Sequence, residues 1–163
     1  MTSQRAAIEY ALPPGRFEWR FQGWFNPEYL ELPLGASLYL LYLLRGTDLS
    51  IAARIRNVDG ALLPGLVIRN ADGSLTSRNA DTEIQIGAWR QWRVELLRLA
   101  TRETTAILYL DENGRATEQA RLNGDMEGVE PTRLRAGIGF SSPGVRARVM
   151  LDEFWITETE LLV

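Results

Sequence analysis

The side chains available for chemistry are few in kind. The 163 residues include no cysteine and no histidine, and all 18 basic residues are arginine. Without cysteine there is no thiolate nucleophile, and without histidine there is no Ser-His-Asp triad, no imidazole base and no usual transition-metal site. The absence of lysine also excludes Schiff-base chemistry and a P-loop lysine. Carboxylates, tyrosine, serine and arginine are the groups that remain.

Arginine dominates the polar positions of the alternating segments. A guanidinium binds carboxylates and phosphates in a bidentate manner, so arginines on one face would form a basic stripe suited to sulfated, phosphorylated or uronic-acid glycans. Cross-strand Arg-Glu ladders are the alternative, and genome composition alone would also explain the missing lysine. The candidate ligand-binding arginines are Arg133, Arg135 and Arg148; the others at such positions are Arg20, Arg54, Arg56, Arg93 and Arg146.

Composition sets the class of protein. The apolar fraction is 45%, the charged fraction is 24% and the net charge is −3, so we expect one globular domain that does not bind nucleic acid. No apolar run approaches the roughly 20 residues of a membrane helix, so we expect no membrane insertion. Met1 to Gly15 does not resemble a signal peptide, and the compartment is not predicted. An extracellular or surface location fits if the chain is mature or excerpted.

Short alternating segments predict an all-β fold. Residues 17–22, 92–96 and 133–140 alternate apolar with polar side chains, which is typical of strands with one buried face. Turn sequences such as Asp59-Gly60 and Asn113-Gly114 separate them. About ten to twelve strands are too many for one open sheet of this size, so we expect a two-sheet antiparallel β-sandwich. It would fill residues 6–160, between an N-terminal arm at 1–5 and an end at 161–163.

Four segments resemble the concanavalin A-like lectin and glucanase superfamily in its laminin G-like branch. They cover about 140 residues in matching order: 17–21 (FEWRF), 87–95 (GAWRQWRVE), 107–114 (ILYLDENG) and 151–156 (LDEFWI). The third carries Asp-Glu-Asn-Gly where the family commonly has Asp-Gly. The resemblance implies a jelly roll and a carbohydrate or an anionic glycan as the partner.

The resemblance also directs attention to particular acids. Laminarinase-type hydrolases of this fold place acids at alternate positions, as in Glu-x-Asp-x-Glu, so that two carboxyls lie about 5 Å apart. This sequence has only pairs, at Asp81 and Glu83, at Asp125 and Glu127, and at Glu158 and Glu160. Asp152 and Glu153 match the closing strand, near which some members hold a calcium ion. The alternative is that Asp152 caps backbone amides at a bulge.

Tryptophan and leucine supply two further candidates. Trp19 and Trp92 fall in the buried register, whereas Trp89, Trp155 and Trp24 are candidates for stacking on a sugar ring. The segment Leu38 to Leu44 (LYLLYLL) is apolar on both faces, so its second face is covered either by another part of the chain, such as 61–68, or by self-association with a second subunit.

These features favour a non-catalytic recognition module, and therefore not an enzyme, that binds carbohydrate through loops or the concave sheet. The alternative is a structural or assembly subunit such as a coat, filament or decoration protein. A glycoside hydrolase or lyase ranks third, because the chain has no histidine and no Glu-x-Asp-x-Glu run.

Overall fold

The computed structural model describes residues 7–12, 17–98, 103–128 and 130–160, and these residues form eleven β-strands and no helix. The predicted all-β fold is confirmed. No helix within the described ranges is long and apolar enough to cross a membrane. The strands are β1 (Ala7–Ala11), β2 (Phe17–Glu31), β3 (Ser37–Arg45), β4 (Asp48–Val58), β5 (Ala61–Arg69), β6 (Leu75–Asn79), β7 (Arg90–Arg98), β8 (Glu103–Glu112), β9 (Arg115–Asp125), β10 (Arg133–Ser141) and β11 (Arg146–Glu160).

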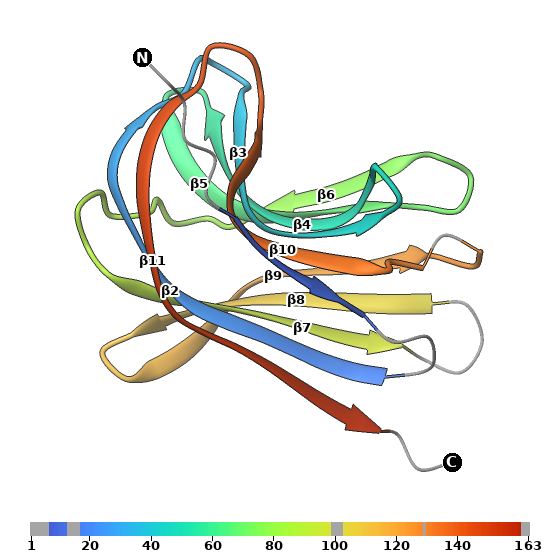
Figure 1. The fold of residues 1–163 in the computed structure, drawn as a ribbon. Helices are drawn as coiled ribbons and strands as arrows, with labels where there is room; N and C mark the ends of the chain where they lie inside the picture. Colours follow the sequence, from blue (N-terminus) through green and yellow to red (C-terminus); the bar gives the residue numbers. More distant parts are fainter. Residues whose placement is uncertain (1–6, 13–16, 99–102, 129, 161–163) are drawn as a thin grey trace.

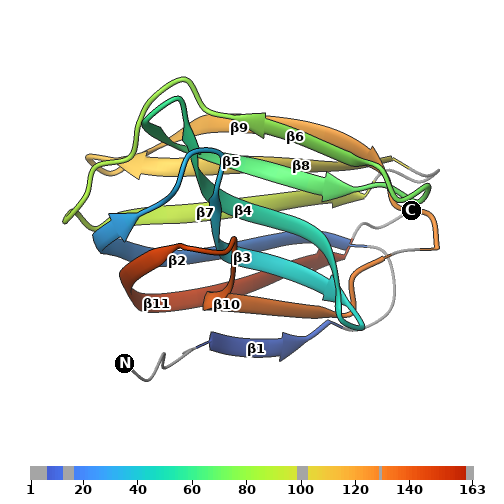
Figure 2. The same ribbon diagram turned by 90° about the horizontal axis from the view of Figure 1, so that it is seen from above.

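The strands form two antiparallel sheets that pack face to face (Figure 1). The six-stranded sheet has the order β1-β10-β3-β4-β5-β6, and the five-stranded sheet has the order β11-β2-β7-β8-β9. Figure 2 shows the strands of the six-stranded sheet side by side in this order, in the layer nearest the viewer. Both sheets curl in the same direction, so the outer face of the six-stranded sheet is concave (Figure 1). This is the jelly-roll β-sandwich that the sequence predicts.

The residues at two hairpin turns adopt the backbone conformations that their sequence predicts. The β4–β5 connection has φ of 52° at Asp59 and 94° at Gly60, and the β8–β9 connection has φ of 57° at Asn113 and 77° at Gly114. Two consecutive positive φ angles define the type I′ turn, whose twist matches that of the flanking strands. These dipeptides therefore fix the register of both hairpins.

The core lies between the sheets and is rich in aromatic rings. Trp19 and Phe21 stack with ring centroids 5.8 Å apart, and Phe25 meets Trp92 edge-on at 6.2 Å. Trp19 and Trp92 are buried, which confirms the predicted register of their strands. Such pairs stabilise a core beyond the area that they bury, by about 0.5–1.5 kcal/mol each.

Gly65 determines how closely β5 and β6 approach. A Cβ added there would lie 2.5 Å from the backbone oxygen of Arg78 and 2.9 Å from Oδ1 of Asn79. We therefore expect Gly65→Ala to lower the free energy of unfolding by about 1–3 kcal/mol, since β6 must move. Denaturant unfolding checks this, with the exposed Ser77→Ala as a control that changes it by less than about 0.5 kcal/mol. Equal midpoints for the two variants would contradict this account of the strand contact.

Candidate functional site

The concave outer face of the six-stranded sheet carries a second apolar cluster, separate from the core. It consists of Tyr42, Leu44, Ala52 and Val67, with Tyr39 and Leu49 packed against it. None of the described strands forms a further layer over this face (Figure 1). On a concave face neighbouring side chains converge, and the cluster members bury one another even though they point away from the core.

This cluster explains the doubly apolar segment from Leu38 to Leu44. Leu38, Leu40, Leu41 and Leu43 belong to the core, whereas Tyr39 and Tyr42 belong to the outer cluster. We expected either the segment 61–68 or a second subunit to cover the second face of this strand. The segment 61–68 contributes Val67 of β5, which packs against the side of the outer cluster. All of these side chains except Tyr39 are already buried within one chain. Self-association through this strand stays a prediction.

Arg54 lies beside this cluster and is only 6% exposed. The register places it opposite Tyr39 of β3 and opposite Gly65 of β5, which has no side chain to offer it. Within the described ranges of the chain, its Nε and Nη2 atoms have no hydrogen-bond partner. Burial lowers the pKa of the Arg54 guanidinium; a hydrogen bond and the charge interaction with Tyr39 oppose this shift, and the charge of Arg56 adds to it.

A buried cation with unused donors is costly to maintain. Leaving one buried donor unsatisfied costs about 1–3 kcal/mol, and more when the group is charged. Among the described residues, no carboxylate forms an ion pair with Arg54. Its free donors have the fork geometry that binds a carboxylate or phosphate. This guanidinium donates a hydrogen bond to the Tyr39 hydroxyl, so the two polar groups lie together on the concave face.

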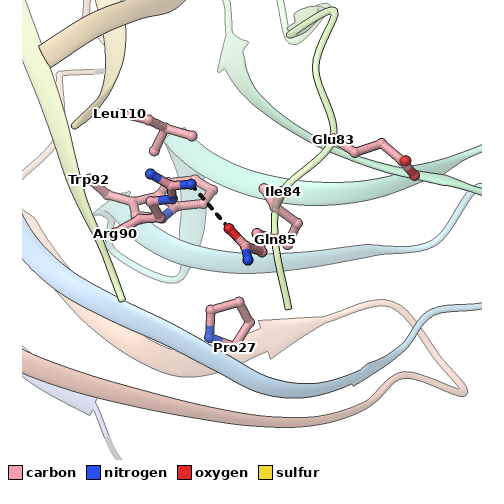
Figure 3. A pocket seen from close by; sticks show the side chains of 7 residues that line it. All are labelled: Pro27, Glu83, Ile84, Gln85, Arg90, Trp92 and Leu110. Atoms are coloured by element: carbon pink, nitrogen blue, oxygen red, sulfur yellow. Dashed lines mark hydrogen bonds between the residues drawn. The ribbon is translucent and has the colours of Figure 1, made fainter. Parts of the chain in front are cut away.

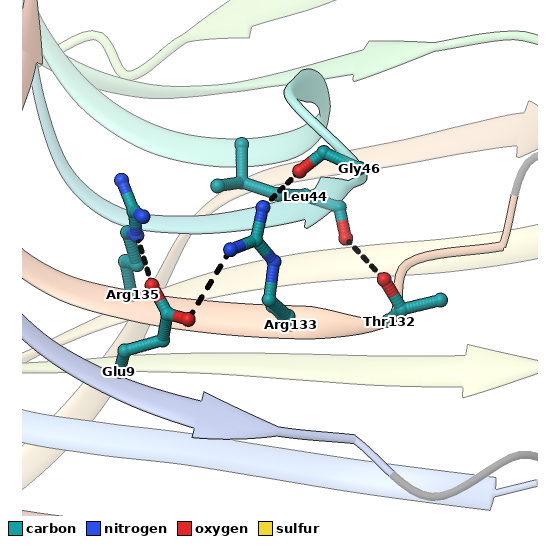
Figure 4. A network of polar contacts seen from close by, with 6 residues as sticks. All are labelled: Glu9, Leu44, Gly46, Thr132, Arg133 and Arg135. Atoms are coloured by element: carbon teal, nitrogen blue, oxygen red, sulfur yellow. Dashed lines mark hydrogen bonds and ion pairs between the residues drawn. The ribbon is translucent and has the colours of Figure 1, made fainter.

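Arg133 and Arg135, both predicted ligand-binding residues, lie on the same face near its edge. Arg133 Nη1 donates to Oε1 of Glu9 at 3.2 Å, and Arg135 Nε donates to Oε2 at 2.5 Å (Figure 4). Arg133 also donates to the carbonyl oxygen of Gly46. The register pairs Arg135 with Tyr42 of β3. The two arginines therefore connect β1 to β10 and border the cluster around Arg54.

Glu9 makes the attachment of β1 sensitive to acid. The pKa of Glu9 is lowered, first by the hydrogen bond from Arg135, then by the charge of Arg135, and then by the hydrogen bond and the charge of Arg133. A lowered carboxyl pKa stabilises the folded state above the ordinary glutamate range, and this contribution is lost as pH falls through the folded-state pKa. We expect the amides of β1 to lose hydrogen-exchange protection selectively in acid. Glu9→Gln should show the same loss at neutral pH, whereas Glu28→Gln should not; pH-independent protection of β1 would contradict the assignment.

Four other predicted residues meet on the opposite side of the molecule. Trp24, Trp89, Asp152 and Glu153 line one shallow pocket of about 280 Å³ on the outer face of the five-stranded sheet. The register pairs Asp152 with Trp24, and a bulge separates Asp152 from Trp155. Trp155 pairs with Gln22, two residues along β2 from Trp24, and is 59% exposed.

Asp152 accepts a hydrogen bond from the backbone, which is the alternative to calcium binding that the sequence left open. Its Oδ1 accepts a hydrogen bond of 2.8 Å from the backbone N–H of Glu153, whose φ is 46°. Within the described part of the chain, no group of three or more His, Cys, Asp or Glu side chains is placed to hold a metal ion. A calcium ion at Asp152 and Glu153 stays a prediction.

Arg148 lies apart from the other two predicted arginines. It is on β11, opposite Tyr29 of β2, and its Nε is 4.0 Å from Oε2 of Glu28. Arg20 and Arg93 also lie on the five-stranded sheet, and both pair with Glu95. The expected basic stripe is therefore divided between two sheets, and much of it forms the cross-strand Arg-Glu ladder that was its alternative.

A smaller cavity of about 180 Å³ opens where the segment before β7 crosses the end of the sandwich. Figure 3 shows Arg90 pointing toward Gln85 across it, with Nη2 donating to Oε1 at 3.2 Å. Glu83 at its edge accepts the backbone N–H of Leu62 at 3.1 Å. Its polar groups have partners within the protein, so we place the functional site elsewhere.

Sequence reasoning missed the central members of the concave site. Nothing in the sequence distinguished Arg54 from the seven other arginines at polar positions. Tyr39 and Tyr42 were counted only as members of an apolar segment. A signal was present, because tyrosine hydroxyls within a leucine-rich strand require polar partners. Register alone brings Tyr39 next to Arg54.

The architecture and the comparisons agree on the fold of this chain. The chain has a two-sheet antiparallel jelly-roll fold. An alginate lyase from Klebsiella pneumoniae matches with a TM-score of 0.60 and 10% identity over 87% of this chain; the chain spans 60% of the length of that enzyme. An endo-β-1,4-glucuronan lyase from Trichoderma reesei matches with a TM-score of 0.59 and 15% identity, over 93% of this chain and 73% of that one.

A tetrameric galectin from the sponge Cinachyrella matches with a TM-score of 0.55 and 14% identity, over 95% of this chain and all of that one. No family model matches the sequence, and no curated protein matches it. At these identities the comparisons show the fold.

The comparisons correct the functional interpretation of the sequence. The expected non-catalytic recognition module, and the expectation that the chain is not an enzyme, are contradicted because several structures with this fold are alginate and glucuronan lyases. The missing run of alternating acids counts only against hydrolysis. An elimination needs a base and a group that neutralises charge, so it does not require two carboxylates.

Proposed function

We propose that this chain is a polysaccharide lyase that cleaves uronic-acid polymers by β-elimination on the concave face of the six-stranded sheet. The observation that carries this proposal is Arg54, which is buried beside Tyr39 with two N–H donors that have no partner among the described residues. Alginate and glucuronan, named in the matching lyases, are both uronic-acid chains, which supports the substrate class.

The reaction places specific demands on the protein. A base removes the proton from the carbon next to the uronate carboxyl, and negative charge develops on that carboxyl group. The new electron pair forms a carbon–carbon double bond as the glycosidic carbon–oxygen bond breaks. The leaving oxygen then takes up a proton. A site needs donors at the carboxylate and one group that moves protons.

Arg54 and Tyr39 meet these demands as a pair. The Arg54 guanidinium, whose Nε and Nη2 are buried, binds the substrate carboxylate once the side chains around it move aside, and it stabilises the charge that develops on that carboxylate. The Tyr39 hydroxyl transfers the proton from the sugar carbon to the leaving oxygen; its place opposite Arg54 puts both groups at one sugar unit. Arg135, beside Tyr42, is positioned for a carboxylate of a neighbouring unit.

The test is incubation of the purified chain with alginate, glucuronan and a neutral β-glucan. Elimination leaves an unsaturated uronate at each new chain end, which absorbs in the ultraviolet, whereas hydrolysis does not. We expect absorbance to rise with a uronic-acid polymer and to stay flat with the glucan. Flat traces with both uronic-acid polymers, together with no binding of their oligomers, would contradict the proposal.

A further inference from the structure

The pocket on the outer face of the five-stranded sheet is a separate feature that the elimination chemistry does not use. Its lining combines two indole rings, Trp24 and Trp89, with two carboxylates, Asp152 and Glu153. Trp89 is 42% exposed, and Asp152 and Glu153 are both exposed, so all three are accessible to a ligand. The pocket lies on the five-stranded sheet, whereas Arg54 lies on the six-stranded sheet.

The backbone keeps these four side chains together. The inward position of Gly23, whose added Cβ would meet Phe154, Leu151 and Phe25, turns the adjacent Trp24 outward. The bulge after Asp152 inserts one extra residue into β11, and Glu153 adopts the left-handed conformation there. Bulges change the direction of side chains, and this one directs Glu153 into the pocket.

The charge of the pocket is not balanced by the protein. Among the described residues, neither Asp152 nor Glu153 forms an ion pair with an arginine, although the chain carries arginines on both sheets. Asp152 instead accepts a hydrogen bond from the backbone N–H of Glu153. Two adjacent negative charges repel uronates and attract cations. The indole faces add to this preference, because their ring quadrupole attracts cations.

We propose that this pocket binds an amino sugar with a free, protonated amino group. The flat apolar face of a pyranose stacks on an exposed indole, and the ammonium group pairs with Glu153 and Asp152. The ligand is thus opposite in charge to the polymer bound by the concave face. The inference does not depend on the proposed lyase function, because it uses different residues and a different ligand.

A matched pair of ligands tests the inference by calorimetry with the full chain. The chitosan hexamer carries free amines, and the chitin hexamer has the same backbone with each amine acetylated. We expect the chitosan hexamer to bind and its affinity to fall as salt is added, while the chitin hexamer binds at least tenfold more weakly. Equal affinity for the two hexamers, or no binding of the chitosan hexamer, would overturn the inference.

Variants of the pocket sharpen this test. We expect Trp89→Ala to weaken binding of the chitosan hexamer about tenfold and Glu153→Gln to weaken it about threefold to fivefold. Arg54→Met, on the other sheet, should leave this binding unchanged while it affects binding of uronates. Circular dichroism verifies that each variant is folded. Unchanged binding in both folded pocket variants would place the ligand elsewhere and overturn the assignment.

Discussion

Replacing Arg54 with methionine is expected to lower turnover of a uronic-acid polymer by about 10²–10³-fold without loss of stability. The loss of one preorganised donor that stabilises developing charge lowers rates by about 10²–10³-fold. Methionine keeps most of the side-chain length among Tyr39 and its apolar neighbours, and it removes a buried charge whose Nε and Nη2 find no partner in the part of the chain that the structure describes. We therefore expect the free energy of unfolding to stay the same or to rise by about 1–3 kcal/mol.

The control for Arg54→Met is Arg148→Met, since Arg148 is highly exposed and its nearest acid is 4.0 Å away. It should change neither turnover nor stability. A large loss of stability in Arg54→Met would show that Arg54 is structural. Native turnover in a stable Arg54→Met variant would remove the guanidinium from the mechanism.

Tyr39→Phe is expected to separate turnover from binding. The variant keeps the ring that packs against the outer cluster and loses only the hydroxyl next to Arg54. Loss of a group that transfers a proton lowers kcat by about 10²–10⁴-fold. Because the Arg54 donors for the carboxylate remain, the affinity for an oligouronate should change by less than about fivefold. Steady-state kinetics and calorimetry on the same preparation measure the two quantities.

Tyr109→Phe provides the matched comparison for Tyr39→Phe. Tyr109 lies on the five-stranded sheet, where the Arg93 guanidinium is 4.4 Å from the centre of its ring, so it presents the same arginine–tyrosine pairing far from the concave face. Its kinetics should be native. If Tyr39→Phe lowers affinity and leaves kcat unchanged, the hydroxyl binds substrate and another group transfers the proton.

The fold was predictable because its determinants are local. Alternating side chains define the strands, and the Asp59-Gly60 and Asn113-Gly114 turns have the positive φ angles that such dipeptides favour. The segment Leu38 to Leu44 was harder to interpret. A register shift between Tyr39 and Leu41 turns both Leu40 and Leu41 toward the core, so alternation is lost within a regular strand.

The concave site was not predictable from residue patterns, because curvature creates it. Arg54 occupies a position that should face solvent, and only the convergence of side chains on a curved sheet buries it. Its pairing with Tyr39 depends on the register between β3 and β4. For the pocket on the five-stranded sheet, the sequence predicted the residues but not that they lie together. Its residues were candidates for two separate roles, and the bulge in β11 brings them into one site.

The most direct test of the central claim is the NMR signal of the Arg54 Nε–H group during titration with an oligouronate. A buried guanidinium N–H exchanges slowly enough to be observed, and Arg54→Met assigns the signal by its disappearance. The account predicts a saturable shift of this signal as the substrate carboxylate becomes its partner. If the Arg54 signal stays fixed while signals from the five-stranded sheet shift, the concave face is not the binding site.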